Sequence, residues 1–149
     1  MEKFTSTQQL DSPDKKKVLF ICSHNAGRSQ MAEGFLRELY GDKYEAYSAG
    51  TQVSEVNPLV IKVMEELGID MSRHRSKSIE EFRDMEFDYV VTVCDQVGET
   101  CPFFPGGKKY LHENFDDPSK FKGTEEEIFA SIRKVRDEIK ERIKETFGK

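Results

Sequence analysis

Long hydrophobic runs are absent from this sequence of 149 residues. No stretch reaches the roughly 18 consecutive apolar residues of a membrane-spanning helix, and the N-terminus lacks the apolar core of a signal peptide. Positive charge is also in deficit, because 28 acidic side chains outnumber 23 Lys and Arg and give a formal net charge of −5. This balance argues against binding to nucleic acid or to an anionic membrane. We therefore expect a cytoplasmic protein with neither of these partners.

Cysteine is scarce, with only Cys22, Cys94 and Cys101. An odd number of cysteines in a reducing compartment favours catalysis, redox exchange or metal binding over a structural disulfide. The interval between Cys94 and Cys101 exceeds a usual short chelate, and the three histidines show no spacing typical of paired metal ligands. We therefore predict no metal site and no cofactor.

Repeats and low-complexity tracts are absent too, so one domain is the simplest organisation. The predicted strands are 17–22, 45–48, 89–94 and 109–112. The predicted helices are 28–40, 58–67, 78–84 and a long helix that begins after Thr124. Strands that alternate with helices predict an α/β fold, a three-layer α/β/α sandwich around a four-stranded parallel sheet. Residues 17–149 form this domain, and the polar residues 1–16 are predicted to be a flexible extension.

The strongest functional signal runs from Val18 to Phe35, where an apolar stretch ends at Cys22 and Arg28 follows at the start of an amphipathic helix. In such a loop the backbone N–H groups converge in front of the positive end of the helix dipole and form a cradle for a tetrahedral oxyanion. Arg28 can clamp two of its oxygens, and the positive field favours the nucleophilic thiolate of Cys22. The predicted oxyanion-binding residues are Ser23, His24, Asn25, Ala26, Gly27, Arg28 and Ser29.

This motif resembles the phosphate loop of the low-molecular-weight protein tyrosine phosphatases, a fold that hosts both phosphatases and thiol-dependent arsenate reductases. The segment that ends in Val-Thr-Val-Cys94 and continues over six residues to Cys101 and Pro102 resembles the redox segment of the thioredoxin-coupled arsenate reductases. The alternative is that Cys94 is a plain buried cysteine and Cys101 an incidental loop thiol.

The resemblance to these reductases implies a relay of three thiols. Cys22 attacks arsenate, and Cys94 then attacks the adduct, which releases arsenite and leaves a disulfide between Cys22 and Cys94. Cys101 attacks Cys94 and moves the oxidation to a disulfide between Cys94 and Cys101. The implied partners are arsenate as substrate and thioredoxin as electron donor, and we expect the protein to be a monomer.

Asp117 is the candidate general acid, because the leaving oxygen needs a proton. The run Asp116, Asp117, Pro118 resembles the acid loop of the family, in which the aspartate directly before proline does this work. The alternative is an ordinary Asp-Pro turn. Phosphatases of this fold typically continue with tyrosines that shape the substrate entrance, whereas Ser119 and Lys120 follow here, which favours a small inorganic substrate.

Several residues are expected to support the loop. Ser29 can donate a hydrogen bond to the Cys22 thiolate, and Asn25 can hold the loop geometry through backbone hydrogen bonds. His24 occupies a position that is often glycine in relatives, and Gln30 stands where phosphatases usually have proline. His74 is interpreted as a structural or surface residue.

A potassium site is the further expectation that the resemblance raises. Some reductases of the family bind potassium through residues that match Asn25, Glu33, Ser48 and a downstream aspartate. Alignment places Lys77 at that aspartate, and its ammonium group can replace the metal charge beside Glu33. We therefore predict no potassium dependence; the alternative is that Lys77 is a solvated surface residue.

Two other functions remain open at this stage. A phosphatase acting on phosphotyrosine or small phosphate esters would use Cys22, Arg28 and Asp117 through a phospho-enzyme and would ignore the other two thiols. A non-enzymatic oxyanion or redox sensor would turn over neither substrate. The sequence favours an arsenate reductase.

Overall fold

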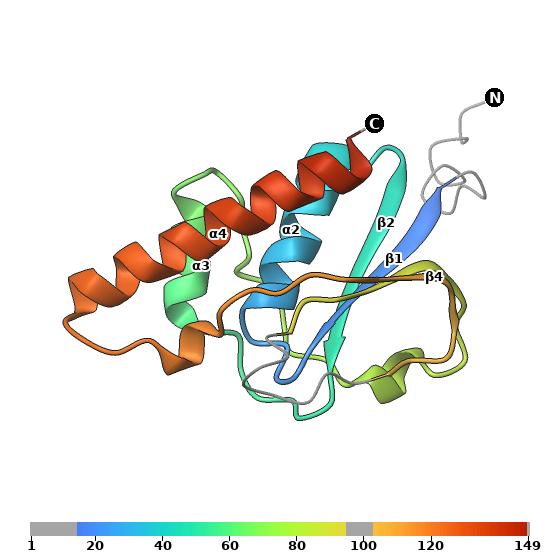
Figure 1. Cartoon of the computed structure of the whole chain (residues 1–149), viewed down its shortest axis with the longest axis horizontal. Helices are drawn as coiled ribbons and strands as arrows, with labels where there is room; N and C mark the ends of the chain where they lie inside the picture. The colour runs from blue at the N-terminus through green and yellow to red at the C-terminus, as the bar shows by residue number, and fades with distance from the viewer. Residues whose placement is uncertain (1–14, 95–102, 149) are drawn as a thin grey trace.

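The computed structural model describes residues 15–94 and 103–148. Its centre is one sheet of four parallel strands in the order β2-β1-β3-β4 (Figure 1). The strands are β1 (Lys16–Cys22), β2 (Tyr44–Gly50), β3 (Phe87–Thr92) and β4 (Gly107–His112). β1 therefore lies inside the sheet, with its last residue, Cys22, between the ends of β2 and β3.

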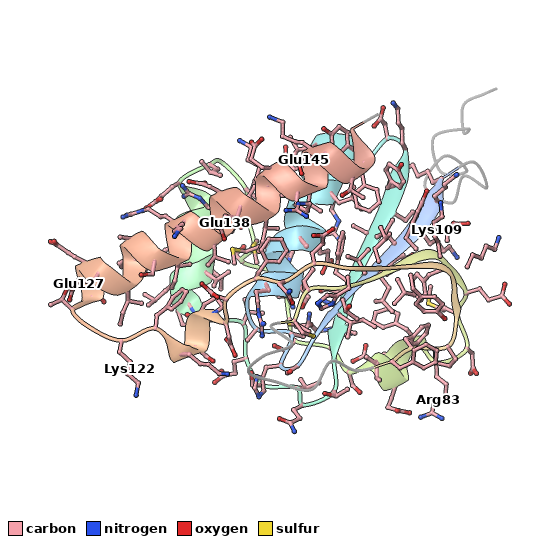
Figure 2. All side chains as sticks on the ribbon, in the orientation of Figure 1. Arg83, Lys109, Lys122, Glu127, Glu138 and Glu145 are labelled. Carbon is pink, nitrogen blue, oxygen red and sulfur yellow. The ribbon has the colours of Figure 1, made fainter. Side chains whose placement is uncertain are left out.

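Three α-helices pack together on one face of the sheet (Figure 1). They are α2 (Arg28–Tyr40), α3 (Pro58–Glu65) and α4 (Glu125–Phe147). Two 3-10 helices complete the described elements: η1 (Ile79–Phe82) precedes β3, and η2 (Pro118–Lys120) precedes α4. Acidic side chains such as Glu127, Glu138 and Glu145 line the exposed side of α4 (Figure 2). Among the residues described, no helix has both the length and the apolar character needed to cross a membrane.

The side chains of β1 alternate between two hydrophobic cores. Val18 and Phe20 belong to the core under the three α-helices, whereas Leu19 and Ile21 belong to the core on the opposite face. The second core is completed by aromatic side chains of η1, β3 and the segment before β4, namely Phe82, Phe87 and Phe104. Burial of both faces explains the continuous apolar run of this strand. The predicted α/β fold, a three-layer sandwich around a four-stranded parallel sheet, is confirmed. Among the described residues, the layer on the second face is formed by η1 and its neighbouring segments rather than by an α-helix.

Two predicted helix starts are confirmed by side-chain caps. The Asn57 side chain accepts a hydrogen bond from the N–H of Leu59, and Pro58 is the first residue of α3. Thr124 and Glu127 form a reciprocal capping box at the start of α4. Local side-chain chemistry therefore places these two boundaries.

The predicted third strand is displaced by two residues. β3 covers Phe87–Thr92 instead of 89–94, because its pairing with β4 ends where Thr92 lies opposite His112. The chain nevertheless stays beside β1 for two more residues, since the N–H of Val93 donates to the carbonyl of Ile21 at 2.9 Å. Cys94 thus lies just beyond the strand rather than on it.

The predicted helix at 78–84 is a single 3-10 turn, η1. Ser78 caps it through the N–H of Glu80, not through that of Glu81 as a capping box requires. The Glu81 carboxylate instead forms a two-pronged ion pair with Arg75. The predicted box at this position is wrong, because the Ser78 hydroxyl accepts the N–H of Glu80 and so does not cap Glu81.

The predicted division of the chain at residue 17 stays a prediction. β1 begins at Lys16, one residue before the expected start of the domain, and residues 1–14 lie outside the described chain.

Candidate active site

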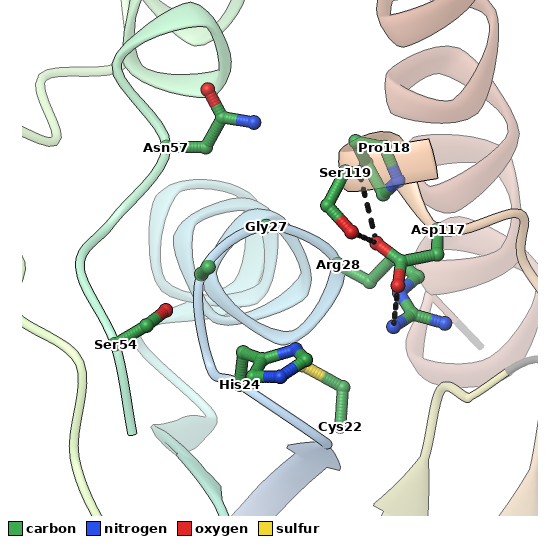
Figure 3. Close-up of a pocket in the computed structure, with 10 residues that line it drawn as sticks. Cys22, His24, Gly27, Arg28, Ser54, Asn57, Asp117, Pro118 and Ser119 are labelled. Carbon is green, nitrogen blue, oxygen red and sulfur yellow. Dashed lines mark hydrogen bonds and ion pairs between the residues drawn. The ribbon is translucent and has the colours of Figure 1, made fainter. Parts of the chain in front are cut away.

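A pocket of about 280 Å³ opens at the carboxyl end of β1 (Figure 3). It brings together three segments that lie far apart in the sequence: the anion loop (residues 22–29), the segment before α3, and the acid turn (residues 117–119). The lining residues are Cys22, His24, Ala26, Gly27, Arg28, Ser54, Asn57, Asp117, Pro118 and Ser119. Ligands of parallel α/β sheets bind at this end of the strands.

Backbone hydrogen bonds fix the outer side of the anion loop. The carbonyls of Ser23 and Ala26 accept hydrogen bonds from the N–H groups of Gln52 and Asn57, at 2.8 and 2.9 Å. A Cβ at Gly50 would lie 2.6 Å from the Ser23 oxygen, so only glycine allows β2 to end this close to the loop. An anion-binding loop needs carbonyls that are engaged elsewhere, because their oxygens repel an oxyanion.

Asn25 holds the tight bend of the anion loop. It is fully buried and has a left-handed backbone, with φ of 54°, which asparagine tolerates better than most residues. Its carbonyl accepts from Ser76 Oγ at 2.8 Å, and its side-chain oxygen accepts from the N–H of Lys77 at 2.7 Å. The strained residue is therefore held in place by the segment that precedes η1.

Cys22 lies at the base of the pocket and is 2% exposed. Its Sγ is 2.9 Å from the Oγ of Ser29, and Asn25 Nδ2 donates to that same hydroxyl at 2.7 Å. Once Cys22 is a thiolate, Ser29 is the only possible donor of the two, and the bond from Asn25 leaves its proton available for the sulfur. The loop is thus arranged to stabilise a thiolate.

Arg28 and Asp117 lie side by side at the pocket and form an ion pair (Figure 3). The Arg28 Nη2 lies 3.5 Å from Asp117 Oδ2, and its Nη1 donates to the carbonyl of Phe115 at 3.3 Å. The other oxygen of Asp117 accepts from the backbone and side chain of Ser119, at 2.9 and 2.8 Å. One carboxylate oxygen of Asp117 therefore faces the Arg28 guanidinium, and the other is hydrogen-bonded to Ser119 within the acid turn.

Cys94 is fully buried beside the end of β1. Its Sγ lies 3.8 Å from the carbonyl oxygen of Ile21, the residue that precedes Cys22. Cys101 lies outside the described residues. The structure therefore places two of the three predicted redox cysteines at the same end of the sheet.

A charged cluster lies behind the anion loop. Glu33 accepts hydrogen bonds from Ser48 and Arg37, and the Lys77 ammonium lies 3.5 Å from Glu33 and donates to the carbonyl of Arg75 at 3.1 Å. Burial lowers the pKa of Lys77, and the Glu33 carboxylate opposes this effect. Within residues 15–94 and 103–148, no group of three His, Cys, Asp or Glu side chains could hold a metal ion.

Sequence reasoning missed the structural role of Gln30. Its Nε2 donates to Asn25 Oδ1 and to the carbonyl of Arg75, each at 2.8 Å, which fixes its Oε1 as an acceptor. His74 Nδ1 lies 2.8 Å from this oxygen and is therefore the protonated ring nitrogen. Burial lowers the pKa of His74, which favours this neutral form. The available signal was the position of Gln30, a polar residue on the buried face of the first turn of α2, which indicates a hydrogen-bonding role.

Two pocket residues were missed as well. Ser54 carried no signal in the sequence, and Asn57 was recognised only as the cap of α3. Both line the pocket opposite the acid turn, where hydroxyl and amide groups can hydrogen-bond an incoming anion.

Comparison with known proteins agrees with this geometry. The family described as low molecular weight phosphotyrosine protein phosphatase matches residues 17–149. An arsenate reductase of Halalkalibacterium halodurans is 45% identical over 131 residues, which cover 88% of this chain and 94% of the relative. A solved arsenate reductase in its phosphate-binding state has a TM-score of 0.73 at 37% identity and covers 87% of this chain and 95% of its own.

A thioredoxin-dependent arsenate reductase of Corynebacterium glutamicum is also similar in structure. It has a TM-score of 0.67 at 31% identity, and the match covers 97% of this chain and 68% of that protein. The expected family is confirmed: the chain belongs to the low molecular weight phosphotyrosine protein phosphatase family and, within it, to the group of arsenate reductases.

Proposed function

We propose that this protein reduces arsenate to arsenite, with Cys22 as the nucleophile and Cys94 and Cys101 as the thiols that supply the relay. The observation that carries the proposal is the second buried thiol, Cys94, whose sulfur lies 3.8 Å from the carbonyl next to Cys22. A phosphatase needs one cysteine, an oxyanion cradle and an acid, and has no use for this second sulfur. The protein is proposed to act as a monomer, without a metal or organic cofactor.

The first step is attack on arsenic. Arsenate occupies the anion loop, where Ser23, His24, Asn25, Ala26, Gly27, Arg28 and Ser29 surround it. The Cys22 thiolate, stabilised by Ser29, forms a bond to arsenic while one arsenic–oxygen bond breaks. Asp117 gives a proton to the departing oxygen, which leaves as water. The ion pair of Arg28 with Asp117 keeps the acid and the clamp on the same side of the substrate.

The second step reduces the arsenic. The Cys94 thiolate attacks the Cys22 sulfur, a disulfide forms, and the electron pair of the sulfur–arsenic bond stays on arsenic, which leaves as arsenite. A disulfide requires Cα atoms within roughly 7 Å. The contact of Cys94 with the carbonyl of Ile21 supports this step, because that residue is joined directly to Cys22.

The last steps restore the thiols. Cys101 attacks Cys94, which forms a new disulfide and frees Cys22 as a thiolate. Thioredoxin, a dithiol protein, then reduces the disulfide between Cys94 and Cys101. The thioredoxin-dependent relative from Corynebacterium glutamicum supports this choice of reductant.

One coupled assay tests the proposal. Arsenate-dependent oxidation of NADPH is followed with thioredoxin and thioredoxin reductase, for the wild type and for Cys94→Ser, and hydrolysis of p-nitrophenyl phosphate is measured beside it. We expect arsenate turnover in the wild type alone, with any phosphatase activity kept in both forms. Phosphatase activity without arsenate turnover in the wild type would make the protein a phosphatase that acts through a Cys22 phospho-enzyme.

A further inference from the structure

A pair of exposed aromatic rings stands out on the surface beside β4. Phe103 is 72% exposed, more than any other large hydrophobic side chain of the described chain, and Tyr110 is 45% exposed. Their rings stack, with centroids 5.5 Å apart and planes inclined by 26°. We call these two residues the aromatic platform.

The platform is held in place by its own strand. Tyr110 Oη accepts a hydrogen bond from the N–H of Gly107 at 3.0 Å, so the ring lies back over the start of β4. A Cβ at Gly107 would be 3.1 Å from two atoms of that ring and 2.6 Å from Val90, which only glycine avoids. Phe103 stacks on a ring that is already fixed. A surface ordered in this way loses little conformational entropy when a partner covers it.

The fold itself does not account for the exposure of Phe103. The next residue, Phe104, fills the core: it is 3% exposed and packs edge-to-face on Phe87, with centroids 5.7 Å apart. Phe104 therefore packs in the core, whereas the adjacent Phe103 is exposed to solvent. β4 is also the last strand in the order of the sheet, so Tyr110 lies on an edge strand.

Chain connectivity ties the platform to Cys101. Consecutive Cα atoms are about 3.8 Å apart, so the Cα of Phe103 lies within roughly 7.6 Å of that of Cys101. A protein interface covers about 800 Å² on each partner, which corresponds to a disc with a radius of roughly 16 Å. Phe103 therefore lies within the radius of an interface that is centred on Cys101.

We propose that the aromatic platform, Phe103 and Tyr110, is the docking surface for the dithiol protein that reduces the disulfide between Cys94 and Cys101. This inference rests on the proposed function, since it needs the disulfide that the relay produces. The partner is a protein with an apolar surface around its reactive thiol, which packs on the two rings. Aromatic side chains are frequent among the few residues that dominate binding energy at such interfaces.

Docking leads to two exchange reactions. A thiolate of the partner attacks the Cys101 sulfur, the bond between Cys101 and Cys94 breaks, and Cys94 leaves as a thiolate. The second thiolate of the partner then attacks the mixed disulfide and releases Cys101 as a thiolate. The partner ends as a disulfide, and its two electrons have restored both cysteines.

The test compares a protein reductant with a small one. Arsenate reduction by the wild type, Phe103→Ser and Phe103→Tyr is measured at saturating arsenate, first with increasing bacterial thioredoxin plus its reductase and NADPH, then with dithiothreitol. Leu67→Ser is the matched control, because Leu67 is a 40% exposed residue that follows α3 on the helical face. We expect Phe103→Ser to raise the KM for thioredoxin about tenfold and to leave the rate with dithiothreitol unchanged. Phe103→Tyr and Leu67→Ser keep the wild-type KM.

The outcomes separate the docking surface from the function. A KM for thioredoxin that is unchanged in Phe103→Ser, with reduction by dithiothreitol intact, overturns the docking surface and leaves the proposed function standing. An equal loss of arsenate reduction by Phe103→Ser with both reductants would mean that the substitution disturbs the fold, and this result also overturns the docking surface. Absence of arsenate reduction by the wild type with either reductant overturns the proposed function, and the docking surface with it.

Discussion

The anion loop and the acid turn line one pocket, yet they are built differently. In the anion loop Asn25 and Ser29 are completely buried, and hydrogen bonds reach the loop from Gln52, Asn57 and Ser76. The acid turn is held by short-range hydrogen bonds within residues 117–121 and by one ion pair of 3.5 Å to Arg28. The Asp117 side chain is 11% exposed, whereas the Arg28 side chain is 3% exposed.

The difference in burial and hydrogen bonding matches two different roles, oxyanion binding by the anion loop and proton transfer by the acid turn. An oxyanion is stabilised by donors that are already in position, so the loop that binds it must be rigid. A general acid has to lose and regain a proton in every cycle, which favours a group that solvent can reach. Changes in the loop should therefore alter both anion affinity and rate, whereas changes in the acid turn should alter the rate alone.

The largest effect is expected from Arg28→Lys. Lysine keeps the positive charge but cannot span two oxygens or replace the bond to the carbonyl of Phe115. We expect kcat/KM for arsenate to fall by about 10²- to 10³-fold, with a higher KM. Steady-state kinetics at constant ionic strength measure both parameters. A wild-type KM for arsenate in Arg28→Lys would contradict the role of Arg28 as a rigid clamp.

Asp117→Asn should have the next largest effect. The amide keeps the shape of the turn and its bonds to Ser119 but cannot give a proton to the leaving oxygen. We expect kcat to fall by about 10²-fold while the inhibition constant of phosphate, a competing oxyanion, stays unchanged. Asp116→Asn is the matched control, and it should behave as the wild type. An equal loss in both variants would argue against Asp117 as the acid.

His74→Gln should change stability rather than chemistry. Burial lowers the pKa of His74, so the unfolded chain binds more protons than the folded one between that pKa and about 6.5. The free energy of unfolding of the wild type therefore rises with pH across this window, and the stabilisation is lost on acidification. Urea denaturation at several pH values from 5 to 7.5 measures the slope. The variant should show a smaller slope; an identical slope would mean that His74 does not titrate with folding.

The smallest effect is expected from potassium. The Lys77 ammonium lies 3.5 Å from Glu33, where it can supply the positive charge that some relatives take from the metal. Potassium and sodium chloride at equal ionic strength should therefore give the same kinetic parameters for arsenate. Lys77→Met removes the charge and is the variant in which a difference between the two salts can appear. Clear activation of the wild type by potassium over sodium would show that Lys77 does not replace the ion.

The anion loop could be predicted from the sequence because its determinants are local. An apolar run, a cysteine, five residues and an arginine at a helix start lie within one stretch, and the helix caps at Asn57 and Thr124 are equally local. The same holds for β1, whose apolar residues are continuous because both of its faces are buried.

What sequence reasoning missed depends on contacts across the fold. The end of β3 is set by the register with β4, in which Thr92 meets His112. The hydrogen bond between His74 and Gln30 joins residues 44 positions apart, and the local sequence around either residue does not predict it. Ser54 reaches the pocket only because the chain after β2 folds back over the anion loop. Pairing and packing of this kind become visible only in three dimensions.

The central claim is that arsenate draws its two electrons from the cysteines of this chain. The most direct test is to mix the fully reduced protein with arsenate in the absence of any reductant and to count thiols and arsenite. The sequence holds three cysteines. We expect two thiols to disappear and one arsenite to form per chain, with neither change in Cys22→Ser. Three thiols that persist in the wild type, with no arsenite formed, would contradict the account.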